Sequence, residues 1–248
     1  VIESSAFNEC KSLHQITIPD SVTSISDSTF FNCISLEQVT LSKSLTTIGN
    51  YVFGGCKKLK EIEIPNSVTS IGDSIFNDCE NLAKVVLSSA IKEIPKKCFS
   101  DCISLTEISI PSTVESIKSH AFENTGLRKV EIPNSVKIIE IYAFGNCKKL
   151  SEVLVPSSVT LISSYAFANC VSLTTLKIPN SVKQIEDGVF KGCTNLSEID
   201  IPNSVTKIPE GAFYGCESLL RVSIPDSVTF IGKNAFKKCA KLKEISVP

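Results

Sequence analysis

The sequence of 248 residues contains no methionine and no tryptophan, and its formal net charge is only −1. This near-neutrality removes the usual electrostatic argument for a nucleic acid or an anionic membrane as partner. No apolar run approaches the roughly 20 residues that a membrane-spanning helix needs. Because a natural chain starts with methionine, we expect this one to begin inside a longer protein or to have been processed. The lack of a signal peptide therefore decides nothing about its compartment.

Sequence motifs for catalysis and metal binding are also missing. The two histidines, His14 and His120, are far apart and have no matched nucleophile. There is no glycine-rich phosphate loop, no G-x-S-x-G sequence and no C-x-x-C pair. We predict a protein that is not an enzyme and that uses neither a cofactor nor a metal ion.

What the sequence has is an internal repeat of 23 residues, and this repeat decides the fold. Its consensus is L-x-x-I-x-I-P-x-S-V-x-x-I-x-x-x-A-F-x-x-C-x-x, and one step, from Leu105 to Leu127, is shortened to 22 residues. We predict a single solenoid domain over residues 1–248. It comprises a partial repeat at 1–12, repeats that start at residues 13, 36, 59, 82, 105, 127, 150, 173, 196 and 219, and a terminal strand at 242–248.

Each recurrent position has a physical role. The L-x-x-I-x-I phrase alternates as a short strand with one buried face does. The proline that follows cannot extend a ladder and ends the strand. The serine after it falls in a turn, where a hydroxyl can satisfy backbone groups. One repeat cannot bury its apolar face alone, so we expect neighbours to stack around an unbroken phenylalanine column. That column is Phe7, Phe30, Phe53, Phe76, Phe99, Phe122, Phe144, Phe167, Phe190, Phe213 and Phe236.

The repeat resembles the BspA-like, or Treponema pallidum-type, leucine-rich repeats. Its diagnostic core is nearly complete from Ile64 through Pro65 and Gly72 to Phe76 and Cys79. The resemblance covers the whole chain. It implies a leucine-rich-repeat solenoid, a right-handed curved stack of about eleven units with a parallel β-sheet on one face and mostly irregular or short helical returns on the other. It also implies a cell-surface role in adhesion, with host or matrix proteins as partners, although fold transfers better than function.

The eleven cysteines look like a disulfide framework by number but not by position. Ten of them occupy one repeat position, where all would face the same way into the stack. We interpret them as small buried hydrophobic side chains, since adjacent thiols of such a column could pair only with strain. Unpaired thiols in this number favour a reducing cytosol or an anaerobic habitat.

The exposed strand positions form the first candidate binding surface, the sheet face. One column alternates acid and base from Glu61 onward, with Thr175 as its one break, which favours a self-neutralising ladder over a column selected for a partner. A second column is mostly small and has no aromatic residue, so the face is a poor site for one tight epitope. The candidate residues are Glu61, Glu63, Lys84, Glu107, Lys129, Glu131, Glu152, Leu154, Lys177, Glu198, Asp200 and Arg221.

The second candidate surface lies on the returning side and is called here the returning-side patch. The position two before each core phenylalanine becomes aromatic in three successive repeats, and nearby positions turn apolar beside the short repeat with Thr125. Such clusters mark interaction surfaces, although side chains that fill a local kink would give the same pattern. Its members are His120, Ile138, Ile141, Tyr142, Leu161 and Tyr165.

Two functions remain open from the sequence. The first is a protein-binding module for surface-associated adhesion or recognition, which the resemblance implies. The second is an intracellular scaffold or structural protein of a protist assembly, which the cysteine column favours. In both, the partner is a protein, with no nucleic acid and no direct membrane insertion by this segment. The compartment stays open between the cell surface and the cytoplasm.

Overall fold

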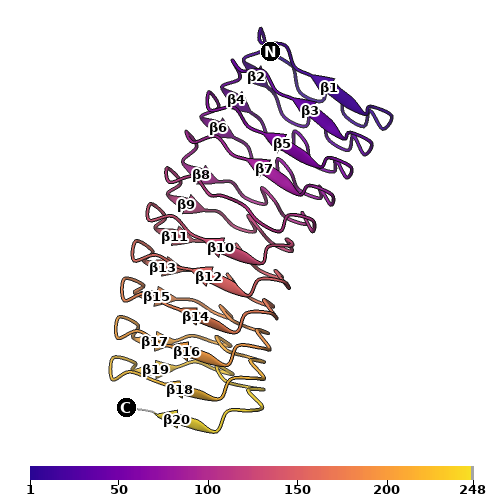
Figure 1. Ribbon diagram of the computed structural model, residues 1–248. Coiled ribbons are helices and arrows are strands. Elements are labelled where there is room, and N and C mark those ends of the chain that lie inside the picture. The colour runs from indigo at the N-terminus through magenta and orange to yellow at the C-terminus, as the bar shows by residue number, and fades with distance from the viewer. Residues whose placement is uncertain (247–248) are drawn as a thin grey trace.

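The structure is a computed structural model, and it describes residues 1–246. The chain coils into one gently curved stack in which each repeat makes a single turn (Figure 1). The first file of strands forms the sheet face. It comprises β1 (Gln15–Thr17), β3 (Gln38–Thr40), β5 (Glu61–Glu63), β7 (Lys84–Val86), β10 (Lys129–Glu131), β12 (Glu152–Leu154), β14 (Thr175–Lys177), β16 (Glu198–Asp200), β18 (Arg221–Ser223) and β20 (Glu244–Ser246). β20 lies within the terminal strand expected at 242–248, and residues 247–248 lie outside the described part of the chain.

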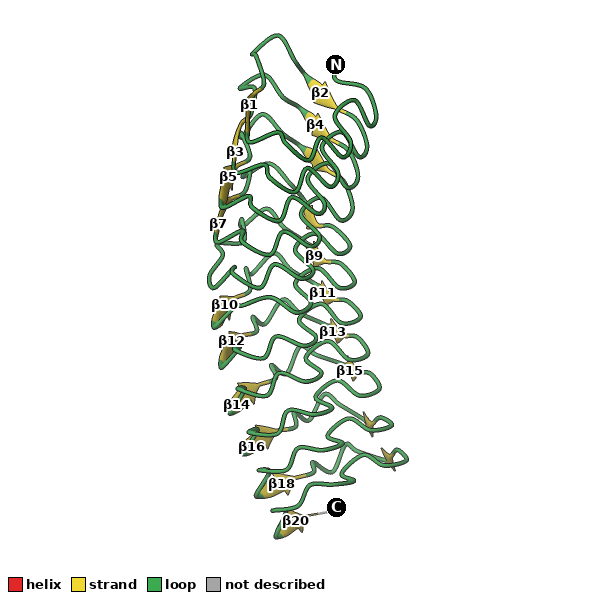
Figure 2. Cartoon of the chain, turned by 90° about the vertical axis from the view of Figure 1, so that its right-hand side faces the viewer, coloured by secondary structure: helices red, strands yellow, loops and turns green. Residues whose placement is uncertain are grey.

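A second file of two-residue strands runs along the returning side (Figure 2). Every pairing in both files is parallel and joins equivalent positions of neighbouring repeats, as Ile138 of β11 with Leu161 of β13. The file comprises β2 (Ser24–Ile25), β4 (Thr47–Ile48), β6 (Ser70–Ile71), β8 (Glu93–Ile94), β9 (Ser116–Ile117), β11 (Ile138–Ile139), β13 (Leu161–Ile162), β15 (Gln184–Ile185), β17 (Lys207–Ile208) and β19 (Phe230–Ile231).

Of the two alternatives expected for the returns, irregular or short helical, the structure has the first, since no helix occurs within residues 1–246. The segment around each core phenylalanine is a run of tight turns. Alternate N–H groups donate to the next repeat, Phe30 to the carbonyl of Val52 at 2.9 Å and Asn32 to that of Gly54 at 2.8 Å. The intervening groups close turns within the repeat, as Cys33 does on Phe30 at 3.2 Å. Because half of the donors go to the neighbour, a continuous helical ladder cannot form.

Two positions in each repeat make these turns possible, because their backbone is left-handed. All residues with positive φ, between 52° and 74°, lie either two before the core phenylalanine or directly before the cysteine position. Glycine, asparagine and aspartate tolerate this conformation best. The second position follows that preference, and this signal in the sequence was missed. Its residues are Glu9, Asn32, Gly55, Asp78, Asp101, Asn124, Asn146, Asn169, Gly192, Gly215 and Lys238.

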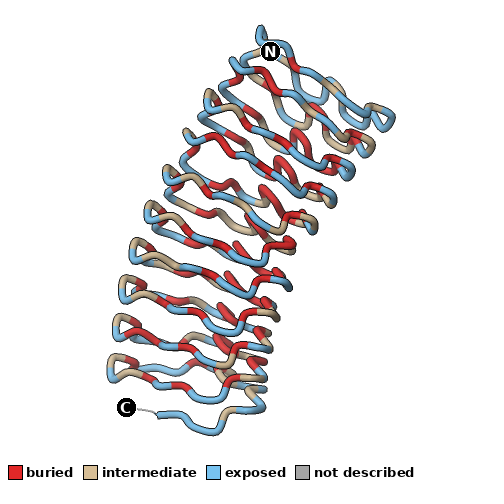
Figure 3. Tube along the Cα trace, in the orientation of Figure 1, coloured by how far each residue is buried: buried red, intermediate tan, exposed pale blue. Residues whose placement is uncertain are grey.

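The core is a continuous column of stacked phenylalanine rings. Neighbouring rings lie 5.2–5.9 Å apart between centroids, from Phe7 to Phe236. The rings from Phe30 to Phe213 are fully buried, and buried segments recur inside every turn of the stack (Figure 3). The expected phenylalanine column is therefore confirmed as the centre of the fold.

The cysteine position is buried from Cys33 to Cys216, whereas Cys10 in the partial repeat is exposed. From Cys33 on, each cysteine at this repeat position donates its thiol to the carbonyl of the core phenylalanine in the preceding repeat, at 3.0–3.2 Å. All eleven cysteines are free. The column is thus a ladder of hydrogen bonds as well as a set of small apolar side chains.

The short repeat interrupts the sheet face. The expected strand at 107–109 does not form, so β7 and β10 are not joined through it. The turn that is one residue shorter brings Gly126 so close to the preceding repeat that a Cβ there would lie 2.3 Å from the Ile103 carbonyl oxygen. Only glycine permits this approach. The ladder of the sheet face is therefore interrupted in the repeat that is one residue short, although Arg128 still donates to the Thr106 carbonyl at 3.1 Å.

Candidate protein-binding surfaces

The three aromatic side chains of the returning-side patch form one stack. His120 and Tyr142 lie 5.2 Å apart between ring centroids, and Tyr142 and Tyr165 lie 4.9 Å apart, all nearly parallel. Each occupies the left-handed position two before the core phenylalanine, with φ between 52° and 60°. The shared backbone geometry projects the three side chains in the same direction. The stack therefore follows from the repeat itself once aromatic residues occupy this position.

The ends of the stack are fixed by their neighbours. His120 Nδ1 lies 2.7 Å from Glu123 Oε2, and Asn146 donates to the other oxygen of Glu123 at 3.0 Å. At the other end Tyr165 packs on Gly188, where a Cβ would lie 2.3 Å from the ring. Burial is the main cause that raises the pKa of the Tyr142 phenol, which stays neutral. The rings are thus held rigidly and are only half-buried.

Two of the three aliphatic members, Ile138 and Leu161, lie on the return strands that precede Tyr142 and Tyr165 in the chain. Ile138 and Leu161 are register partners in β11 and β13. Ile138 is exposed, Leu161 is half-buried, and Ile141, directly before Tyr142, is 44% exposed. The structure therefore brings Ile138 and Leu161 together and places Ile141 next to the aromatic stack along the chain.

Sequence reasoning missed two aromatic residues of related position. Tyr51 occupies the left-handed position two before a core phenylalanine, far from the patch. Its ring contacts the ring of Phe31 edge-on, with 6.1 Å between the two ring centres. Tyr214 directly follows a core phenylalanine. The Lys191 ammonium connects it to the aromatic stack, because this group lies 5.8 Å from the ring centre of Tyr165 and 5.5 Å from that of Tyr214. Comparison of equivalent repeat positions could not reveal this contact, because Tyr165 and Tyr214 occupy different positions in their repeats.

The sheet face has the predicted alternation of charge in register. Glu61 pairs with Lys84 across β5 and β7 at 3.8 Å, and Lys129 pairs with Glu152 across β10 and β12 at 2.8 Å. The hydrogen bond to Glu152 raises the pKa of Lys129. The other register neighbours among the candidates are Glu131 with Leu154, Lys177 with Asp200, and Glu198 with Arg221. Among the described residues, the first two pairs are close enough to neutralise each other, as the ladder interpretation requires, whereas Lys177 with Asp200 and Glu198 with Arg221 are neighbours in register without a close ion pair.

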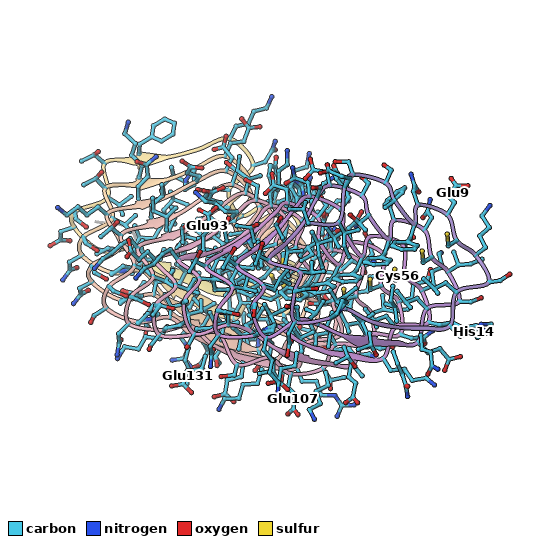
Figure 4. All side chains as sticks on the ribbon, turned by 90° about the horizontal axis from the view of Figure 1, so that it is seen from above. Glu9, His14, Cys56, Glu93, Glu107 and Glu131 are labelled. Carbon is cyan, nitrogen blue, oxygen red and sulfur yellow. The ribbon has the colours of Figure 1, made fainter. Side chains whose placement is uncertain are left out.

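Three shallow grooves line this face. One of about 830 Å³ lies beside the short repeat, where Glu131 and the 46% exposed Leu154 line it together with Ile108. A second, of about 430 Å³, extends over β3, β5 and β7 and is lined by Glu61, Glu63 and Lys84 among others. A third, of about 380 Å³, is lined by Asp200 of β16 and by residues of β18 and β20. Glu107 and Glu131 point outward on this face when the stack is viewed along its length, whereas Cys56 lies inside (Figure 4).

A comparison with protein families identifies the repeat. The model of the BspA type leucine rich repeat region, which holds six copies, matches residues 1–128 and again residues 115–243. The chain belongs to this family. A search of curated proteins finds no significant match.

Solved structures of BspA-type and related proteins share the fold. A leucine rich cell surface protein from Faecalibacterium prausnitzii is 30% identical with a TM-score of 0.66, over 98% of this chain and 81% of that one. The pneumococcal vaccine antigen PcpA is 22% identical with a TM-score of 0.64, over 95% of this chain and 68% of that one. A leucine-rich repeat protein from Eubacterium ventriosum is 20% identical with a TM-score of 0.57, over 94% and 72%. The last two show the fold alone.

Across residues 1–246, no group of three or more His, Cys, Asp or Glu side chains is arranged to hold a metal ion. His14 bonds the carbonyl of Ser12, and His120 bonds Glu123. None of the described residues forms a helix that is long and apolar enough to cross a membrane. What the arrangement provides is surface: a paired charge ladder on one side and a rigid aromatic stack on the other.

Proposed function

We propose that the chain is a non-enzymatic protein-binding repeat module that acts in surface-associated adhesion or recognition. The observation that carries this proposal is the returning-side patch. Its aromatic and aliphatic side chains occupy positions that hold serine, glycine or charged residues in most other repeats. Exposed apolar clusters of this kind mark interaction surfaces. The relative from Faecalibacterium prausnitzii, which is described as a cell surface protein, supports the surface location.

The geometry of the patch suits a protein partner. The rings of Tyr142 and Tyr165 are already stacked in the free molecule. A partner therefore does not have to order them, which reduces the entropic cost of binding. Tyrosine also offers an apolar ring edge together with a hydroxyl, the combination enriched at binding hot spots. The sheet face, with its charges paired along the stack, would contribute specificity rather than most of the affinity.

The test replaces both tyrosines by serine, as in Y142S/Y165S. Serine fits this backbone, because Ser28 and Ser74 occupy the same position with φ of 56°. The variant should fold as the parent does and should lose at least tenfold in affinity for the extracellular-matrix proteins that the parent binds, measured by surface plasmon resonance on a panel of them. Y51S is the matched control, since Tyr51 has the same backbone position outside the patch. An unchanged affinity of Y142S/Y165S for every bound protein would contradict the role of the patch.

A second candidate function is an intracellular scaffold in a protist assembly, and the observation that favours it is the set of eleven free cysteines. Refolding the chain in a glutathione buffer poised for disulfide formation distinguishes the two. If the buried thiols stay free and the native state returns, a secreted protein is feasible. If disulfide-linked aggregates form instead, the scaffold in a reducing compartment is favoured.

A further inference from the structure

The charge on one edge of the stack changes sign at the short repeat. This edge consists of the turns that run from each core phenylalanine to the start of the next sheet strand. From Phe7 to Arg128 these turns are mixed, with the acids Glu9, Glu37, Asp78, Glu80, Asp101 and Glu123 and the bases Lys11, Lys57, Lys58, Lys60 and Arg128. From Phe144 to Lys243 they hold one carboxylate, Glu217, and seven exposed lysines, namely Lys148, Lys149, Lys191, Lys237, Lys238, Lys241 and Lys243. We call this second part the cationic edge.

The lysines of the two parts also differ in their partners. In the mixed part, Lys57 lies 2.6 Å from Glu80 and 3.5 Å from Asp78, and Lys60 lies 2.9 Å from Glu37. In the cationic edge, none of the seven lysines has a carboxylate oxygen within 4.0 Å among the residues described. Their charges are therefore compensated only by solvent ions, which an anionic ligand could displace.

The lysines gather most closely around Tyr214. The ammonium groups of Lys191 and Lys238, from the repeats on either side, lie 5.5 Å and 5.4 Å from the centre of its ring. A hydrogen bond with Lys238 lowers the pKa of the phenol, and the charges of Lys238, Lys237 and Lys191 lower it further. The site thus combines the hydroxyl group of Tyr214 with three cations that come from the repeats on either side of it.

Acidic residues border the cationic edge on both sides and limit the shape of its ligand. Glu152, Glu198 and Glu244 begin the adjoining sheet strands, and Glu186 and Glu210 precede the turns on the other side. A flat anionic membrane would contact these carboxylates as well as the lysines and be repelled. A narrow linear polyanion that runs along the stack would meet the lysines alone.

The aromatic rings beside the edge argue against single-stranded nucleic acid, which binds by stacking bases on open ring faces. Tyr165 is covered by Tyr142 on one face and packs on Gly188 on the other. Both flanking cations lie over Tyr214. We propose that the cationic edge binds a sulfated glycan chain, with the repeating sulfate groups placed along successive repeats. This site uses exposed lysines and none of the returning-side patch, so it stands apart from the proposed protein-binding function.

The test measures binding of the whole chain to a heparin oligosaccharide by isothermal titration calorimetry over a range of salt concentrations. The variant K238S/K241S/K243S should bind at least tenfold more weakly than the parent and show a shallower dependence on salt. The variant K57S/K58S/K60S is the matched control, because it removes the same charge from the mixed part of the same edge. It should bind as the parent does. E217Q should bind more tightly, since it removes the carboxylate within the site.

Each other outcome contradicts the proposal. Equal losses in the two triple variants would mean that overall charge, not the cationic edge, governs binding. Equal affinity for fully desulfated heparin would exclude sulfate recognition, and preferential binding of a DNA duplex would replace the glycan by nucleic acid. A parent that does not bind heparin would exclude the site altogether. Tyr165 contacts Lys191, so the single variant Y142S separates the two proposals: it should bind heparin normally even where it loses affinity for its protein partners.

Discussion

At the scale of single residues, side chains at the same position of the repeat form different hydrogen bonds in the structure. The cysteine was interpreted as a small hydrophobic residue, and its burial agrees with that. Its thiol also donates to a buried carbonyl of the preceding repeat, as Cys79 does to Phe53 at 3.1 Å. In the short repeat Thr125 donates instead to Phe122 of its own repeat at 2.9 Å. One-dimensional patterning predicts which face is buried, but it contains no information on which acceptor lies opposite a donor.

The turn serine gives a matched pair of substitutions. Ser181 donates to the Val159 carbonyl of the preceding repeat at 2.7 Å, whereas the hydroxyl of Ser158 at the same repeat position is buried without a partner among the described residues. We expect Ser181→Ala to lower the free energy of unfolding by about 1 kcal/mol. Ser158→Ala should leave it unchanged or raise it slightly. Urea denaturation followed by circular dichroism measures both, and equal costs would show that the serine acts through something other than this bond.

At the scale of elements, the sequence predicts the strands whose residues alternate between exposed and buried, but not the two-residue return strands or the loss of one sheet strand. The alternation of exposed and buried positions placed most sheet strands and the charge ladder in the correct register, as Glu61 opposite Lys84 shows. The two-residue return strands were not predicted, because two residues carry no periodicity. The strand expected at 107–109 is missing from the repeat that ends in the shorter turn, where Gly126 approaches the Ile103 carbonyl of the preceding repeat. This close approach involves two repeats in contact, so neither repeat alone predicts it.

Removal of one ring from the phenylalanine column should damage the stack locally. Phe167 is fully buried and stacks on Phe144 and Phe190 at 5.5 Å and 5.9 Å. Phe167→Ala should cost about 3–5 kcal/mol of unfolding free energy. Hydrogen exchange should rise in the repeats on either side and stay unchanged at β1, because each repeat contacts only its neighbours. Phe7→Ala, at a half-buried ring with one stacking partner, should cost less. Exchange that rises uniformly along the chain would contradict this local coupling.

At the scale of the whole molecule, the near-zero net charge hides an uneven distribution. The sheet face pairs its charges, while the edge beyond the short repeat concentrates lysines. Net charge alone therefore does not decide whether one surface can bind an anion, since it averages over surfaces that face different ways. The candidate sites could be assigned to faces from the sequence. The contacts within these sites could not be predicted from the sequence, because neighbours such as Lys191 and Tyr214 come from different repeat positions.

The buried thiols should make the whole stack sensitive to alkali. Burial raises the pKa of Cys147 from its ordinary value of 9.0 to about 11, and that of Cys193 to about 12. Between pH 9 and these values the unfolded chain loses thiol protons that the folded chain keeps, so the folded state binds more protons and its stability falls as pH rises. Each such thiol contributes up to about 1.4 kcal/mol per pH unit.

Under reducing conditions, the urea midpoint should therefore fall steadily from pH 8 to pH 10.5. Because Cys10 is exposed, thiolate absorbance is followed in the variant C10S, where it should appear together with unfolding rather than before it. The variant C147S/C193S should show a shallower fall of the midpoint than the parent, because serine does not titrate in this range. A midpoint independent of pH, or strong thiolate absorbance in the folded C10S variant, would mean that solvent reaches the cysteine column. The hydrogen-bonded thiol ladder would then not exclude water, and the stack would be more open than its packing indicates.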